Sequence, residues 1–164
     1  MTNADHTAGG GRDLARLIGE APWHAEDLNI GDWMDLGTVQ VELAEVLAFA
    51  GRFDPLPIHL DEANTTFGGV IASGVHTMAL FSSLASRVFL PRLAIVAGKG
   101  IDRLRMPVPV RPGSTLAGAV EITDIVMHSR RADVSYRATF VDACDRVVLS
   151  FVAITVVSRR IPAS

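Results

Sequence analysis

Residues 74–90 read GVHTMALFSSLASRVFL, and this stretch decides the fold. Almost every residue in it is apolar or small, and only His76 and Arg87 are strongly polar. A surface helix carries a broad polar face, whereas a helix that is apolar all round is buried all round. Ser73 can cap its start, and Pro91 helps to end it. The sequence therefore predicts a central helix with structure packed on every side.

Strand patterns follow this helix. Residues 132–142 alternate apolar and polar side chains, which is typical of a half-buried antiparallel strand. The turn at 142–146 joins them to 146–158, which is apolar on both faces and needs a second cover, such as another subunit. The four predicted strands are 93–106, 114–127, 132–142 and 146–158. Together with a strand in 29–41 and a helix at 42–50, they predict an α+β domain in which an antiparallel sheet wraps around a buried helix, the hot-dog fold.

Length and charge limit the class of protein. A chain of 164 residues suits one domain, and we expect a flexible leader over 1–20 and the folded domain over 21–160. The leader begins polar and rich in glycine, and only residues 13–19 can form a short helical turn. The formal charge is −3 and no basic run is present, so nucleic-acid binding has no electrostatic footprint.

Cysteine usage and hydropathy narrow the class further. Cys144 is the only cysteine, which excludes an internal disulfide and a cysteine-rich metal site. The N-terminus has no apolar signal-peptide segment, and no apolar run is long enough to span a bilayer. We therefore expect a cytoplasmic protein that does not bind membranes.

The segment GRFDPLPIHLDE at 51–62 carries candidate chemistry. Prolines on either side of Leu56 restrict the backbone, so we expect an extended loop that aims Asp54 and His59 at one point. A carboxylate and an imidazole that converge on one water form an acid/base pair. Apolar neighbours would keep this site dry. These neighbours are Phe53, Leu56, Pro57 and Ile58.

Two other interpretations of this segment remain open. Asp-Pro turns are common, so the pattern by itself favours a turn and a structural histidine. A metal site is also conceivable, with Asp61 and Glu62 completing a ligand set around Asp54 and His59. Asp61 is better placed to cap a short turn at 62–65, which weakens the metal interpretation.

Glycine and serine open the central helix. The first N–H groups of a helix lack internal partners and carry partial positive charge, so they can stabilise an oxygen that gains negative charge. Gly74 would let a substrate approach this backbone closely. Equally, Gly74 could serve only to pack the helix tightly against the sheet. His76, two residues further on, is expected to be structural.

Three segments in this order resemble the MaoC-like dehydratase family, the (R)-specific enoyl-CoA hydratase branch of the hot-dog superfamily. They are FDPLPIHLDE, FGGVIASGVHT and RLRMPVPVRPGSTL, and the resemblance covers roughly residues 24–158. It implies that Asp54 and His59 are catalytic and that Gly74 supplies the oxyanion hole. Ser82 matches the helix serine of the family, and Ser73 and Leu56 are expected to contact the substrate.

The resemblance also implies an activity. The family adds water to a trans-2-enoyl thioester or removes it from an (R)-3-hydroxyacyl thioester. It needs no metal or redox cofactor, and coenzyme A counts as part of the substrate. Three arginines cluster near a predicted strand end and could meet the CoA phosphates, although solvated arginines on a strand edge explain them equally well. They are Arg103, Arg105 and Arg111. Leu56 stands where the family often has a polar residue, which affects the expected chain-length preference. We expect a homodimer or a dimer-based oligomer. A thioesterase or a non-catalytic acyl-thioester-binding protein is the alternative.

Overall fold

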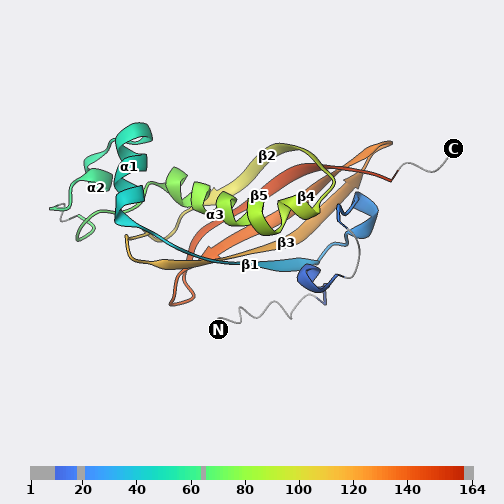
Figure 1. Cartoon of the computed structure of the whole chain (residues 1–164), viewed down its shortest axis with the longest axis horizontal. Coiled ribbons are helices and arrows are strands. Elements are labelled where there is room, and N and C mark those ends of the chain that lie inside the picture. The colour runs from blue at the N-terminus through green and yellow to red at the C-terminus, as the bar shows by residue number, and fades with distance from the viewer. Residues whose placement is uncertain (1–9, 18–20, 64–65, 161–164) are drawn as a thin grey trace.

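The computed structural model describes residues 10–17, 21–63 and 66–160. These residues form an antiparallel five-stranded sheet in the order β1-β3-β4-β5-β2, with the long helix α3 lying along one face (Figure 1). The strands are β1 (Trp33–Gln40), β2 (Ile95–Arg105), β3 (Thr115–Met127), β4 (Arg131–Val141) and β5 (Val147–Ser158). The helices are α1 (Leu43–Phe53), α2 (Pro57–Leu60) and α3 (Gly74–Val88), with short 3-10 turns at Leu14–Arg16, Ala25–Asp27 and Leu90–Arg92. The predicted α+β hot-dog architecture is confirmed.

The core lies between α3 and the sheet. The apolar side chains of β4 point toward α3 and are buried, as their alternation with polar residues predicts. Phe81 of α3 makes edge-on contacts with Phe140 and Phe151, at ring-centroid distances of 5.4 and 5.2 Å. A Cβ added to Gly118 of β3 would lie 3.3 Å from a methyl carbon of Leu84, so helix and sheet pack closely at this point. Aromatic packing of this kind dominates the energetics of such a core.

One face of α3 is exposed in the single chain. Val75 is 61% exposed, although the prediction was a helix buried on every side. The sheet covers only one side of the helix, so the opposite side has no cover from this chain. The exposed residues of α3 are Val75, Ala79, Ser82, Ser86 and Arg87. The expectation of a helix buried all round is therefore wrong for one chain, and small side chains explain why the sequence pattern misled.

The segment that links α1 to α3 is more helical than predicted. Helix α1 continues through Phe53, three residues beyond the predicted end, and a one-turn helix, α2, replaces the expected extended loop. Pro57 is the first residue of α2, a position that tolerates proline because the missing N–H would have no helical partner. Figure 1 shows α1 and α2 together at one end of the molecule, beyond the edge of the main sheet.

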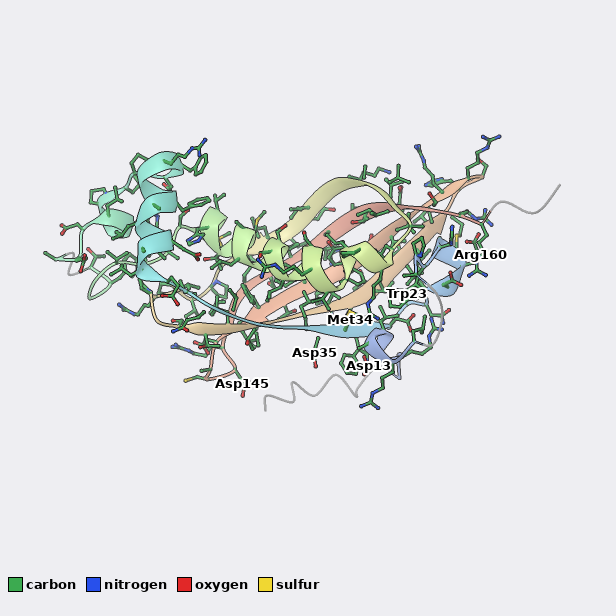
Figure 2. All side chains as sticks on the ribbon, in the orientation of Figure 1. Asp13, Trp23, Met34, Asp35, Asp145 and Arg160 are labelled. Atoms are coloured by element: carbon green, nitrogen blue, oxygen red, sulfur yellow. The ribbon has the colours of Figure 1, made fainter. Side chains whose placement is uncertain are left out.

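The opposite end of the molecule is tied together by ion pairs. Figure 2 places Trp23 and Arg160 there, away from α1 and α2. Arg159 donates a hydrogen bond of 2.7 Å to Glu26 and lowers the pKa of that carboxyl to about 2. The N-terminal segment also packs against the sheet, since Arg12 and Asp32 form an ion pair of 2.6 Å.

Part of the predicted flexible leader is therefore ordered. Residues 10–17 include a short 3-10 turn at Leu14–Arg16, inside the range 13–19 where a helical turn was expected, and Leu14 in this turn is fully buried. Residues 1–9 and 18–20 of that leader lie outside the described residues. Across the described part of the chain, no helix combines the length and the apolar character needed to cross a membrane.

Candidate active site

Asp54 and His59 meet at the junction of α1 and α2. Asp54 directly follows α1, and its N–H donates to the carbonyl oxygen of Ala50 at 2.9 Å. His59 lies within α2. The single turn of α2 directs the imidazole back toward α1, and Nε2 of His59 lies 3.3 Å from Oδ2 of Asp54. The two side chains therefore converge as the sequence predicts, although a helical turn rather than an extended loop brings them together.

A main-chain oxygen fixes the orientation of His59. Its Nδ1 lies 2.8 Å from the carbonyl oxygen of Ile71, and the side chain is almost fully buried. A carbonyl oxygen can only accept a hydrogen bond, so Nδ1 must carry the proton. Nε2 is then the nitrogen that faces Asp54. The sequence gives no signal for the role of Ile71, because the contact uses its backbone.

Ser73 connects Asp54 to the start of α3. Its hydroxyl donates to Oδ2 of Asp54 at 2.7 Å and accepts from the N–H of Val75 at 3.2 Å. The residue is only 1% exposed. The expected cap of α3 is confirmed, and the hydroxyl proton of Ser73, a residue predicted to contact the substrate, is given to Asp54.

Gly74 is the first residue of α3. It follows Ser73 in sequence and packs against the end of β2. Among the described residues, its N–H has no hydrogen-bond partner. A Cβ on Gly74 would lie 2.2 Å from Sδ of Met106, so a larger residue would displace this thioether. Both expected roles of Gly74 therefore have support, since the site combines a tight contact with an unpaired donor.

The apolar surroundings of this pair are open in the single chain. Phe53 is 61% exposed and Leu56 is 51% exposed. The expectation that they keep the site dry does not hold for one chain, because nothing from this chain covers them. His76, in contrast, is buried and stacks on Phe49 of α1 with ring centroids 4.9 Å apart. Burial lowers the pKa of His76, which fits the structural role predicted for it.

Ser82 lines a cavity of about 540 Å³ between α3, β2 and β5. It lies eight residues after Gly74, a distance of about 12 Å along a helix. The cavity walls are mainly apolar, with Met78 and Phe81 from the helix and Ile101 from β2. Ser82 is therefore not in contact with Asp54, although both residues lie on the side of the sheet that carries α3.

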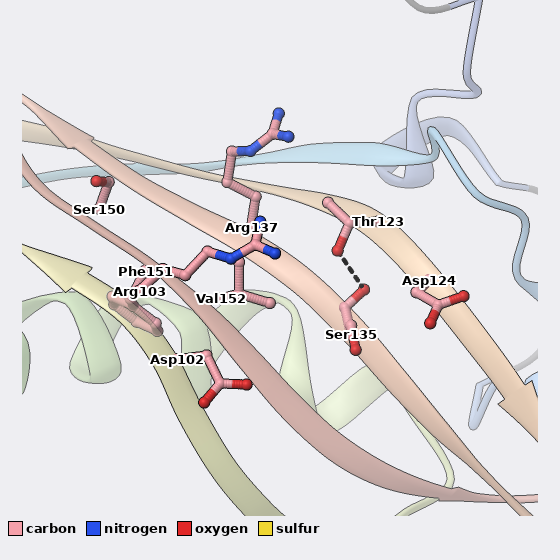
Figure 3. A pocket seen from close by; sticks show the side chains of 9 residues that line it. All are labelled: Asp102, Arg103, Thr123, Asp124, Ser135, Arg137, Ser150, Phe151 and Val152. Atoms are coloured by element: carbon pink, nitrogen blue, oxygen red, sulfur yellow. Dashed lines mark hydrogen bonds between the residues drawn. The ribbon is translucent and has the colours of Figure 1, made fainter.

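Arg103, one of the two arginines expected at the substrate, lies elsewhere. Arg103 and Arg137 line a separate hollow of about 410 Å³ on the face of the sheet away from α3 (Figure 3). Ser135 and Arg137 of β4 point to this outer face because the intervening Tyr136 points to the core. Arg105 donates to the carbonyl oxygen of Leu104 at 2.8 Å. The structure therefore does not place Arg103 beside Asp54 and His59.

The other acidic residues of this segment do not build a metal site. Asp61 accepts a hydrogen bond of 2.9 Å from the N–H of Ala63, as expected for a residue that starts a turn. Within the described ranges, no three His, Cys, Asp or Glu side chains are placed to hold a metal ion. Arg111, which the sequence singles out only as one of three nearby arginines, donates to the carbonyl oxygens of Phe67 and Gly68 and so holds the loop before α3.

The arrangement offers a carboxylate, an oriented imidazole and a helix N-terminal N–H in one place. A carboxylate and an imidazole can exchange protons with a bound water, and a free N–H at a helix start can stabilise a developing oxyanion.

Comparison with known proteins agrees with this geometry. The MaoC like domain family matches residues 28–142. A 3-hydroxybutyryl-CoA dehydratase of Methylorubrum extorquens is 31% identical over 140 residues, which span 82% of this chain and 84% of that protein.

Solved structures give the same result. The crystal structure of a MaoC-like dehydratase from Rhodospirillum rubrum has a TM-score of 0.77 and 38% identity, and covers 85% of this chain and 99% of that one. An (R)-hydratase from A. caviae involved in PHA biosynthesis has a TM-score of 0.64 and 26% identity, and covers 81% of this chain and 98% of that one. With a family match over most of its length and relatives that span nearly their whole chains, this protein belongs to the MaoC-like domain family.

Proposed function

We propose that the protein interconverts trans-2-enoyl-CoA and (R)-3-hydroxyacyl-CoA thioesters by adding or removing water. The observation that carries this proposal is the contact between Nε2 of His59 and Oδ2 of Asp54 at 3.3 Å, next to the unpaired N–H of Gly74. A module that only binds acyl thioesters has no use for a paired acid and base. The related dehydratase and (R)-hydratase support the same reaction class.

The proposed mechanism uses one water between Asp54 and His59. Asp54 accepts a proton from this water while the water oxygen forms a bond with C3 of the enoyl group. The electrons of the double bond move toward the thioester oxygen, where the N–H of Gly74 stabilises the charge. A proton returned from the pair to C2 completes the addition and restores both side chains. Each step uses groups of this chain and the substrate alone, so the proposal includes no metal or redox cofactor.

The cavity beside Ser82 is the proposed site of the acyl tail. It runs along α3 from Met78 to Leu90, in the direction that leads away from Gly74. Its volume of about 540 Å³ and its apolar walls suit a hydrocarbon chain. Ser82 would lie against this chain. Arg103 lines the hollow on the other face of the sheet, and its contact with the CoA phosphates stays a prediction.

The stereochemistry of the product tests the proposal directly. Asp54 and His59 hold water on one side of the alkene while Gly74 fixes the thioester oxygen, so hydration of crotonyl-CoA should give a single stereoisomer. The similarity to (R)-hydratases implies that it is the (R)-3-hydroxy product. The loss of enoyl absorbance would measure the rate, and chiral analysis would identify the product. Activity should survive exhaustive EDTA treatment. An (S) or racemic product would refute the geometry, and release of free CoA without formation of a 3-hydroxyacyl product would indicate a thioesterase.

We also propose that the protein is a homodimer joined through β2. This strand is at the edge of the sheet, and every one of its residues is exposed. An exposed edge is a template for pairing with another chain. Val96 and Ile101 add exposed apolar surface to it, at 60% and 47% exposure. A second copy that pairs with β2 about a two-fold axis would lie next to the uncovered face of α3.

A charge at this edge should weaken the dimer. Val96→Lys places an ammonium group on the edge, where pairing would bury it, so sedimentation should shift from dimer toward monomer. Ile30→Lys serves as the control, because Ile30 is 62% exposed and precedes β1 at the opposite edge of the sheet. A wild-type protein that sediments as a stable monomer at micromolar concentration would rule out the proposed assembly.

A further inference from the structure

One short segment holds every group of the candidate site. The carbonyl oxygen of Ile71 accepts from Nδ1 of His59 at 2.8 Å, and the hydroxyl of Ser73 donates to Asp54 at 2.7 Å. Gly74 follows directly. The segment is itself anchored on both sides, since the N–H of Ile71 donates to Ile58 at 3.1 Å and the next N–H donates to the carbonyl oxygen of Val110 at 2.8 Å. The positions of base, imidazole and N–H donor are therefore linked.

The two oxygens of Asp54 have different surroundings. Oδ2 accepts the hydroxyl of Ser73 at 2.7 Å and faces Nε2 of His59 at 3.3 Å. Nδ1 of His59 is engaged by the carbonyl oxygen of Ile71, and Nε2 only approaches Oδ2, whereas the hydroxyl of Ser73 makes a hydrogen bond with this oxygen. Ser73 is then the side chain that supplies a donor to this oxygen. The Asp54 side chain is 30% exposed, so the carboxylate is still open to solvent on its other side.

We propose that Ser73 is a positioning residue that holds Oδ2 of Asp54, so that Oδ1 is the oxygen that removes the proton from the attacking water. This inference rests on the proposed hydratase function. In the hydration step, the O–H bond of water breaks and its proton moves to Oδ1, while the water oxygen bonds to C3. The enolate then takes one proton from the Asp54–His59 pair at C2, so protons balance.

The geometry separates this role from a substrate contact. The single hydroxyl proton of Ser73 goes to Asp54, and its oxygen accepts from the N–H of Val75 at 3.2 Å. With the residue 1% exposed, the hydroxyl has no further donor to offer a ligand. Ser73 therefore acts on the reaction through the orientation of the carboxylate.

Three substitutions test the role of the hydroxyl. Ser73→Ala should lower kcat by about 10- to 100-fold with little change in KM, which is the loss expected for a hydrogen bond to a charged group. Ser73→Gly should do the same, and it avoids most of the loss of helix capping, because glycine is a tolerated cap. Ser73→Thr keeps a hydroxyl and should restore much of kcat. Thermal melting would confirm that each variant is folded.

A matched control is available one turn further along α3. The hydroxyl of Thr77 donates to the carbonyl oxygen of Ser73 at 3.2 Å and does not touch Asp54. Thr77→Val removes a buried hydroxyl from the same turn, and kcat should stay near the wild-type value. A fall in kcat as large as that of Ser73→Ala would mean that the geometry of the helix start, and not the Asp54 contact, controls the rate, and it would overturn the inference.

A double-mutant cycle gives the decisive measurement. If Ser73 acts through Asp54, Ser73→Ala should have almost no further effect on the residual activity of Asp54→Asn. Losses that multiply would show that Ser73 acts on the substrate or on the helix, and would overturn the inference. Wild-type protein that hydrates enoyl thioesters while Ser73→Ala keeps full kcat would overturn this inference alone. Wild-type protein without hydratase activity would overturn the proposed function, and this inference with it.

Discussion

Asp54→Asn is expected to lower kcat for the hydration of crotonyl-CoA by about two to four orders of magnitude, the usual contribution of a general base. The amide keeps the shape of the side chain and can still accept from Ser73, which lies 2.7 Å from Oδ2. It cannot accept a proton from water. KM should change much less than kcat, because the carboxylate acts on the water and not on the acyl group.

His59→Ala should give a loss of similar order. The imidazole is almost fully buried and is held by the carbonyl oxygen of Ile71 at 2.8 Å, so its removal leaves the water without a second anchor and leaves that oxygen unpaired. The double variant should be only slightly worse than either single one, since the two residues act as a unit. Stopped assays of enoyl absorbance at high enzyme concentration would measure these rates.

Asp61→Asn is the matched control for both variants. Asp61 is an acid in the same segment, but its carboxylate accepts from the N–H of Ala63 at 2.9 Å, and asparagine can keep that bond. Its kcat should remain close to the wild-type value. If Asp54→Asn and His59→Ala hydrate crotonyl-CoA as fast as the wild type, the assignment of this pair is wrong.

Gly74→Ala is expected to lower kcat by about two to three orders of magnitude, the loss seen when an oxyanion donor is removed. The N–H itself remains, but the new methyl group would stand where the thioester oxygen must approach it. The Cβ would also lie 2.2 Å from Sδ of Met106, so part of the effect could come from a displaced thioether. Steady-state kinetics on crotonyl-CoA would measure the loss.

A second substitution separates these two causes. Met106→Ala removes the thioether and gives a Cβ on Gly74 room, and by itself it should leave kcat near the wild-type value, because Met106 is 40% exposed. If close approach of the substrate matters, Gly74→Ala/Met106→Ala should remain as slow as Gly74→Ala. Recovery of activity in the double variant would show that Gly74 serves only the packing of α3 against the end of β2.

The sequence by itself determined the elements of the fold. Alternation over 132–142 predicted β4, because its period records which side of a strand meets the core. The stretch 74–90, which is apolar on every side, predicted α3. The convergence of Asp54 and His59, five residues apart on one segment with two prolines, was also predicted, although α2 brings them together instead of the expected extended loop. Local spacing was sufficient in each of these cases.

Local pattern failed where the outcome depended on what surrounds an element. Residues 74–90 look buried on every side, yet one face of α3 is open, because the single sheet covers only half of the helix. The expected extended loop became α2, since Pro57 fits the first position of a helix as well as it fits a loop. A pattern of apolar residues does not reveal whether the same chain or a second one provides the cover.

Only the tertiary structure decided which groups share the site. Ser73 donates to Asp54 across 19 residues of sequence, and the carbonyl oxygen of Ile71 holds His59 across 12 residues. Arg103, in contrast, lines the outer hollow, although it is only three residues from Met106, which packs against Gly74 at the start of α3. Such contacts follow no period, because they depend on where α1, α2 and the start of α3 meet in space. The sequence determined the chemistry of each side chain, whereas the packing of these three elements determined which oxygen of Asp54 is engaged and which is left to react.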